Sequence, residues 1–149
     1  MKLKSRALGA LAGLSALIVV TSVSLAADRP YSQGTVTVVS SLRTMPGMHD
    51  AYLSYLATTY RANMEAAKKE GIILGYSVYE TSPRSPDDPN IYLTVTYKNM
   101  AAMDGLDDRM EPIMQRSFGD DAARSAAAID REKMRRPLGT EMIREVVFK

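Results

Sequence analysis

The fold is decided by residues 72–97, which read IILGYSVYETSPRSPDDPNIYLTVTY. Residues 72–80 and 91–97 are rich in β-branched and aromatic residues, and in the second run apolar and polar residues alternate, as in a strand with one buried face. The ten residues between them include three prolines, which exclude a helix or a central strand there. This stretch therefore predicts two consecutive strands joined by a long hairpin loop.

Outward from this hairpin, each side adds one strand and a helical region. Residues 35–42, TVTVVSSL, predict a strand, and residues 48–69 predict a helix because apolar side chains recur there at spacings of three and four. Beyond the hairpin, Gly105, Pro112 and Gly119 interrupt a helical region. We expect helices over 99–105, 107–117 and 120–134, and a last strand over 138–148.

This order of elements predicts an α+β protein with the ferredoxin-like βαββαβ arrangement. Right-handed crossovers would place the helices on one face of a four-stranded antiparallel sheet. On the other face Tyr92, Thr94 and Thr96 follow one another, and such a face is too apolar to be bare surface. We expect a second copy of the chain to cover it, giving a homodimer with its two sheets face to face.

The order of elements over about residues 35–148 resembles that of the dimeric α+β barrel superfamily, which includes antibiotic-biosynthesis-type monooxygenases and stress-responsive barrel domains. The segment YKNMAAM, residues 97–103, adds to the resemblance, because an aromatic residue ends the third strand and leads into a helix. The resemblance implies the barrel fold. For function it implies a wide range, since the superfamily holds cofactor-free oxygenases, haem-handling enzymes, lyases, isomerases and proteins of no known activity.

The N-terminal 26 residues have the layout of a secretory signal peptide. Lys2, Lys4 and Arg6 precede an uncharged run over 7–25, and Ser24-Leu25-Ala26 offers small residues before a cleavage point. We expect a periplasmic or secreted protein whose mature chain, 27–149, is a single domain. The alternative is a retained membrane anchor, since about 19 uncharged residues could just span a bilayer.

Composition excludes several classes of function. Removing the three basic residues of the signal leaves 16 Lys and Arg against 17 Asp and Glu, so the mature chain offers no electrostatic case for binding nucleic acid or, after cleavage, a membrane surface. The chain has no Cys and one His, which excludes disulfides and thiolate sites and argues against a His-built metal centre. We expect neither a metal nor a cofactor.

The candidate site residues are one histidine, several tyrosines and two arginines. His49, at the start of the first helix, is the candidate base, because a helix N-terminus disfavours its cationic form. Tyr97 is a candidate catalytic tyrosine and Arg144 a candidate anion holder. The candidate ligand-binding residues are Tyr52, Tyr60, Arg61, Tyr76, Tyr92 and Thr94, because tyrosine combines an apolar ring with a polar tip.

Each candidate also has a plainer interpretation. His49 can be an ordinary histidine near a helix cap, the tyrosines can pack at an interface, and Arg61 can pair with Glu65 one turn later. The leading hypothesis is a small-molecule-binding protein with an aromatic or apolar ligand in a cavity between sheet and helices. The alternatives are a cofactor-independent oxygenase or lyase acting on a small aromatic substrate in that cavity, and a structural or protein-interaction role without a cavity.

Overall fold

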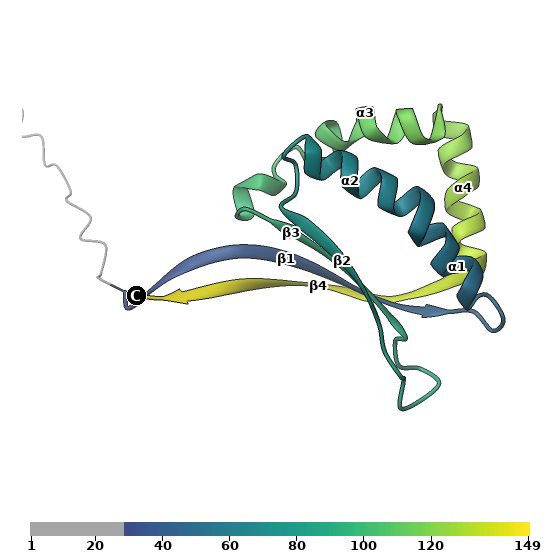
Figure 1. Ribbon diagram of the computed structural model, residues 1–149, viewed down its shortest axis with the longest axis horizontal. Helices are drawn as coiled ribbons and strands as arrows, with labels where there is room; N and C mark the ends of the chain where they lie inside the picture. The colour runs from purple at the N-terminus through teal and green to yellow at the C-terminus, as the bar shows by residue number, and fades with distance from the viewer. Residues whose placement is uncertain (1–28) are drawn as a thin grey trace, which may run out of the picture.

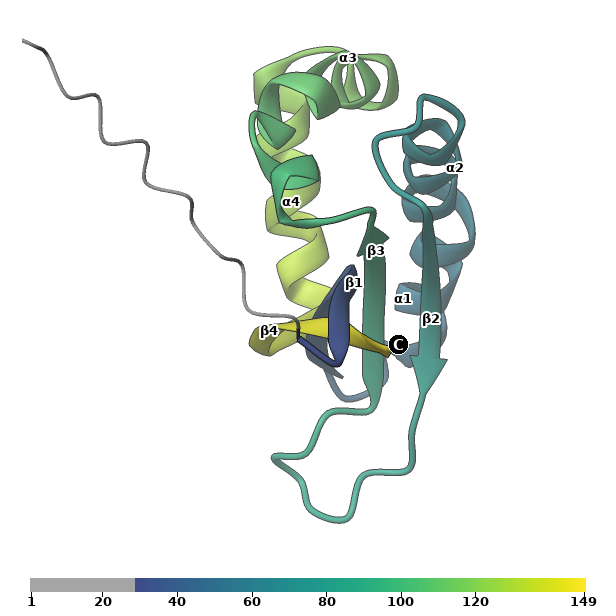
Figure 2. The ribbon, with the colours of Figure 1, turned by 90° about the vertical axis from the view of Figure 1, so that its left-hand side faces the viewer.

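The computed structural model describes residues 29–149, so the predicted signal peptide lies outside the described residues. Four strands form one antiparallel sheet in the order β2-β3-β1-β4. All helices lie on one side of it (Figure 1), and α1–α2 stand beside α3–α4 (Figure 2). The elements are β1 (Tyr31–Thr44), α1 (His49–Tyr55), a π turn (Leu56–Tyr60), α2 (Arg61–Lys69), β2 (Gly75–Glu80), β3 (Ile91–Tyr97), a 3-10 turn (Met100–Met103), α3 (Leu106–Phe118), α4 (Asp121–Met134) and β4 (Arg135–Phe148). The predicted ferredoxin-like α+β fold is confirmed. Among the helices of residues 29–149, none has the length and apolar character needed to cross a membrane.

The register of the sheet separates two kinds of side chain. Val36 pairs with Tyr97 and Leu42 with Ile91, and all four are buried under the helices. Between these pairs, Thr37 lies opposite Thr96 on the open face, where their hydroxyls are 3.0 Å apart. The predicted alternation in β3 is therefore confirmed, because successive side chains of a strand point to opposite faces.

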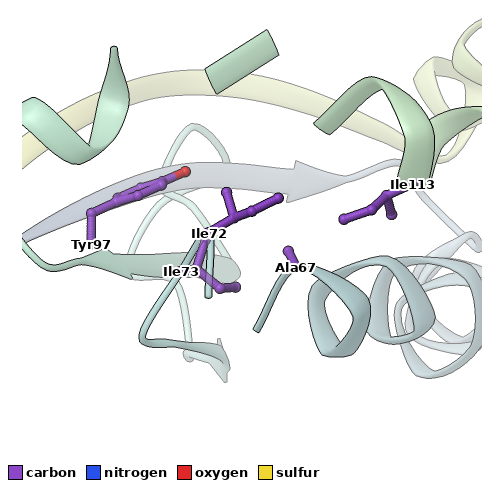
Figure 3. Close-up of a cluster of buried hydrophobic side chains, with 5 residues drawn as sticks. All are labelled: Ala67, Ile72, Ile73, Tyr97 and Ile113. Carbon is purple, nitrogen blue, oxygen red and sulfur yellow. The ribbon is translucent and has the colours of Figure 1, made fainter. Parts of the chain in front are cut away.

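Two hydrophobic clusters fill the space between sheet and helices. The first contains Ala67, Ile72, Ile73, Tyr97 and Ile113, which come from four parts of the chain (Figure 3). The second contains Leu42, Tyr52, Leu56 and Ile91. The core is thus divided into two packed regions under one helical layer.

Three strands differ from the predicted bounds. β1 spans Tyr31–Thr44 and is longer at both ends than the predicted 35–42. β2 begins only at Gly75, and Ile72 and Ile73, which precede it, are buried in the first cluster. β4 begins at Arg135, directly after α4, and runs through Pro137. A proline is tolerated there because β4 is an edge strand and Pro137 directly precedes a register shift opposite Ser41 and Leu42.

The far ends of β1 and β4 form a two-stranded arm that extends beyond the helices (Figure 1). A register shift between Gln33 and Val36 places Gly34 against Glu145, and a Cβ atom on Gly34 would lie 2.5 Å from the Glu145 carboxylate. That carboxylate accepts hydrogen bonds from the backbone N–H and hydroxyl of Thr35. The arm consists of residues 31–35 of β1 and 144–148 of β4, and it exposes Val146, Val147 and Phe148. Met142 and Ile143 are exposed on the adjoining part of β4, where β1 is still paired with β3.

Candidate functional site

A cavity of about 660 Å³ lies between the helices and the covered face of the sheet. Ile73 and Tyr97 of the first cluster and Leu42 and Tyr52 of the second line it, so it separates the two packed regions. Its volume falls within the roughly 300–1,000 Å³ typical of small-molecule sites. The other lining residues are Ser40, Leu93 and Val95 of the sheet; Tyr55, Tyr60, Asn63 and Met64 of the first helix; and Leu106, Asp107, Met110, Glu111, Met114, Phe118, Arg124, Ala128, Arg131 and Arg135 of α3, α4 and the start of β4.

Three tyrosines of the first helix share the cavity wall. The rings of Tyr52 and Tyr55 stack, with centroids 6.0 Å apart and planes 12° from parallel. In a regular α-helix, at about 100° per residue, Tyr60 would lie about 80° around the helix from Tyr52, whereas one extra residue in a π turn leaves it about 20° away. The π turn at Leu56–Tyr60 therefore aligns Tyr60 with Tyr52.

Two arginines of the α4–β4 junction face this tyrosine pair. The guanidinium carbon of Arg131 lies 5.8 Å from the ring centroid of Tyr55, and that of Arg135 lies 6.0 Å from the ring centroid of Tyr52. Arg131 also donates from Nη1 to the Tyr55 hydroxyl at 3.0 Å. The tyrosines are three residues apart and lie on one side of α1, whereas Arg131 lies in the last turn of α4 and Arg135 begins β4. The result is two cations against two stacked rings.

The α3–α4 side of the cavity carries an ion pair. Arg124 donates from both terminal nitrogens to the Glu111 carboxylate, at 2.7 and 2.8 Å, and also to Asp121 at 2.5 Å. These hydrogen bonds hold the pKa of Glu111 below its usual range and raise that of Arg124. Glu111 is therefore an ionised carboxylate already neutralised by its neighbour.

Several polar groups at the cavity lack adequate partners. Within residues 29–149, the hydroxyl of Tyr60 and the Nε atoms of Arg131 and Arg135 are buried without a hydrogen-bond partner. Asn63 is 6% exposed, and its amide nitrogen contacts the sulfur of Met114 at 4.0 Å. Buried donors without acceptors are unfavourable, at about 1–3 kcal/mol each. A ligand bearing acceptor atoms would relieve this.

The cavity tyrosines are held in their neutral form. Burial raises the pKa of Tyr52 to about 12, partly offset by the charge of Arg135. Burial also raises the pKa of Tyr60 and, less strongly, that of Tyr97. A phenol that resists ionisation donates a hydrogen bond and does not accept a proton near neutral pH.

This burial predicts a loss of stability in alkali. Because the folded state raises the pKa of Tyr52 from 10.0 to about 12, its contribution is fully present below pH 10 and is lost as the pH rises towards 12. We expect the free energy of unfolding to fall over this window, and to fall less steeply in Tyr52→Phe. Urea denaturation at a series of pH values measures it. If the free energy of unfolding fell equally steeply with pH in the parent chain and in Tyr52→Phe, the raised pKa of Tyr52 in the folded state would be contradicted.

Among the predicted ligand-binding residues, the structure brings Tyr52 and Tyr60 to the cavity, together with Tyr97. Tyr76 lies beside it, edge-on to the Tyr60 ring at 5.9 Å and donating to Glu65 at 2.7 Å. The structure does not bring the remaining candidates there. Arg61 is exposed on α2, Tyr92 and Thr94 lie on the open face of the sheet, and Arg144 lies on the arm, where it donates to Gln33. Tyr92 and Thr94 miss the cavity because residues 91, 93, 95 and 97 face it.

His49 lies in a second, smaller pocket at the other end of β3. Its Nε2 is 3.1 Å from the Glu80 carboxylate, and its Nδ1 is 3.4 Å from the hydroxyl of Thr44 and 3.5 Å from the amide of Asn90. This pocket measures about 520 Å³ and does not share lining residues with the cavity. His49 therefore ties the start of α1 to the hairpin.

Sequence reasoning missed several polar residues of the cavity, among them Tyr55, Asn63, Arg124, Arg131 and Arg135. Arg131 lies in the last predicted helix and Arg135 directly after it, but nothing in that segment indicates the rings that they contact. Asn63 gave no signal either, since an Asn on an amphipathic helix is ordinarily exposed. In the described part of the chain, no group of three or more His, Asp or Glu side chains is placed to hold a metal ion.

Comparison with known proteins gives structural matches. No family model matches the sequence, and no curated protein matches it. HapK from Hahella chejuensis aligns with a TM-score of 0.50 at 11% identity, over 74% of this chain and 91% of its own. Protein SO0527 from Shewanella oneidensis aligns with a TM-score of 0.49 at 16% identity, over 78% of this chain and 96% of its own. A dimeric ferredoxin-like protein from an uncultured marine organism aligns with a TM-score of 0.48 at 10% identity, over 78% and 96%.

At 11% identity, the likeness to HapK shows the fold alone. It agrees with the strand order β2-β3-β1-β4 and with the helices on one face. The predicted ferredoxin-like α+β fold is therefore supported by the comparison as well as by the sheet topology.

Proposed function

We propose that this protein binds a small aromatic molecule in the cavity between sheet and helices. The observation that carries the proposal is the cavity itself, whose wall combines tyrosine rings with buried donors that lack acceptors. Protein interiors are otherwise packed as densely as organic crystals. A space of this size, left between two close-packed clusters, is what a ligand would fill.

The chemistry of the wall supports an aromatic ligand. Tyr52, Tyr55, Tyr60 and Tyr97 offer ring faces and edges, and aromatic pairs are stabilised by offset or edge-to-face contact. Met64, Met110 and Met114 supply flexible thioether side chains that adapt to the outline of a ligand and contact aromatic rings favourably. An apolar wall with a few placed donors is typical of small-molecule sites.

Binding is better supported than the alternative, a cofactor-independent oxygenase or lyase. The candidate base His49 lies in a separate pocket, and burial raises the pKa of Tyr52 and of Tyr60, which keeps both phenols protonated. Glu111 is paired with Arg124, which weakens it as a base. An enzyme acting in this cavity would have to use another base.

A neutral aromatic probe tests the proposal. We expect naphthalen-2-ylmethanol to bind residues 27–149 in isothermal titration calorimetry, and Ala128→Phe to weaken this binding by about tenfold or more, because the new ring occupies the cavity. Ala126→Phe is the matched control, since Ala126 is exposed on the same helix. The proposal fails if the parent chain gives no binding up to millimolar probe, or if Ala128→Phe binds as the parent chain does.

We also propose that two copies of the chain associate through the sheet and the arm. Ile143 and Val147 are 52% and 43% exposed, and both lie on the open-face side of β4. Met142 and Phe148, on the other side, are exposed as well. Large apolar side chains exposed along one strand in this way indicate an interaction site. A second copy presents the same surface, so a single interface would cover the exposed apolar side chains of both copies.

A further inference from the structure

We propose that the ligand of this cavity carries a carboxylate, held where Arg131 and Arg135 face the Tyr52–Tyr55 pair. This inference rests on the proposed function, because it names the chemical class of the molecule that the cavity binds. It follows from three features of that part of the cavity: the arrangement of the cations, the balance of charge, and the excess of hydrogen-bond donors.

The arrangement places two positive charges against one pair of stacked rings at the cavity. Arg131, in the last turn of α4, lies over Tyr55, and Arg135, the first residue of β4, lies over Tyr52. Neither guanidinium can leave without breaking its ring contact, and Arg131 is also fixed by its hydrogen bond to Tyr55. Two like charges on adjoining rings repel each other, and an anion beside them lowers this repulsion.

The balance of charge leaves Arg131 uncompensated. Arg124 is matched by Glu111 and Asp121, and Arg135 has one contact with Glu132 at 3.0 Å. For Arg131, no carboxylate of residues 29–149 lies within ion-pair distance. A partly buried cation without a counter-charge is unfavourable. An anionic ligand at this position would remove that cost, and would therefore bind with a more favourable free energy than a neutral one.

The hydrogen bonds at this part of the cavity provide donors and no spare acceptor. The Nε–H groups of Arg131 and Arg135 are buried and unpartnered. The Tyr55 oxygen already accepts from Arg131, so its own O–H points elsewhere as a donor. An ionised carboxylate is the group that only accepts hydrogen bonds, and its two oxygens match the planar fork of a guanidinium.

Uncharged side chains also line the cavity, among them Leu93 and Val95 of β3 and Met110 and Met114 of α3. The charged residues of α3 and α4 there include Glu111 and Arg124, which neutralise each other. A ligand with its carboxylate at the arginines would therefore lay its ring along the tyrosines and thioethers. The class of ligand is an aromatic carboxylic acid.

A matched pair of probes separates this inference from the proposed function. 2-Naphthoate and naphthalen-2-ylmethanol share one ring system and differ in charge. We expect 2-naphthoate to bind the parent chain about 10- to 100-fold more tightly, as for a charge-assisted hydrogen bond, and to lose affinity as NaCl is raised. Arg131→Gln is expected to abolish this preference while changing the affinity for the alcohol less than about twofold.

Controls keep the outcomes distinct. Arg116→Gln removes an exposed arginine of α3 that pairs with Glu70, and its preference is expected to equal that of the parent chain. Should Arg131→Gln not fold, Arg131→Lys and the salt dependence of the parent chain carry the test. Equal affinity for acid and alcohol, or an equal loss of both in Arg131→Gln, overturns the carboxylate and leaves aromatic binding standing. No binding of either probe overturns both.

Discussion

A chain carrying Ile143→Lys and Val147→Lys is expected to sediment as a monomer at concentrations where the parent chain sediments as a dimer. Both side chains lie on the same side of β4, four residues apart, and are largely exposed in the single chain. Burying two lysines in an apolar interface without partners would cost several kcal/mol, which is enough to raise the dissociation constant more than about 100-fold. Sedimentation velocity from about 1 to 100 µM measures the change.

The control for this prediction adds the same charge elsewhere. Ser117→Lys and Ala122→Lys place two lysines at exposed positions of α3 and α4, away from the arm, and this chain is expected to remain a dimer. Far-UV circular dichroism confirms that each variant is folded. A parent chain that is monomeric throughout the range, or a lysine variant that sediments like the parent, would count against the proposed dimer.

Truncating Tyr52 is expected to lower the free energy of unfolding by about 3–5 kcal/mol, the range for a fully buried aromatic residue replaced by alanine. Tyr52 is 1% exposed in the second cluster. Its ring also stacks on Tyr55 and lies under Arg135. Tyr52→Ala therefore removes three kinds of contact at once, in a protein whose total stability is of the order of 5–15 kcal/mol.

Urea denaturation at one fixed protein concentration measures this loss, since dimerisation makes apparent stability depend on concentration. Tyr52→Phe keeps the ring and separates its contribution from that of the hydroxyl. Ile129→Ala is the matched control, because Ile129 is 63% exposed on α4, away from the open face of the sheet, and its change is expected to stay below about 1 kcal/mol. A Tyr52→Ala chain as stable as Ile129→Ala would show that the ring does not support the core.

The main elements of the fold were predictable because each has a local cause. Alternation in residues 91–97 indicated a strand with one buried face, and the prolines of residues 81–90 indicated the hairpin loop. Spacings of three and four predicted the first helix, but not the π turn inside it. The last strand was predicted from residue 138, whereas β4 begins at Arg135, because an edge position allows Pro137 within the strand.

For the candidate site, the sequence predicted only which type of residue lines it. An abundance of tyrosine indicated a wall of aromatic rings, and three of the predicted tyrosines, Tyr52, Tyr60 and Tyr97, line the cavity. Tyr92 and Thr94 were set on the other side of the sheet by the same alternation that identified the strand. The arginines of the α4–β4 junction were missed, since nothing in their own segment indicates the rings they lie against.

The sequence by itself determined the order of helices and strands, the side of each strand that is buried, and the kind of side chain available for a site. Those properties follow from interactions between residues close along the chain, such as helical spacing, strand alternation and proline geometry. Only the tertiary structure decided that Tyr55 meets Arg131, 76 residues later, and that a space remains between two packed clusters. Such contacts depend on how whole elements pack against one another. Patterns among neighbouring residues do not encode contacts between residues that are far apart in the sequence.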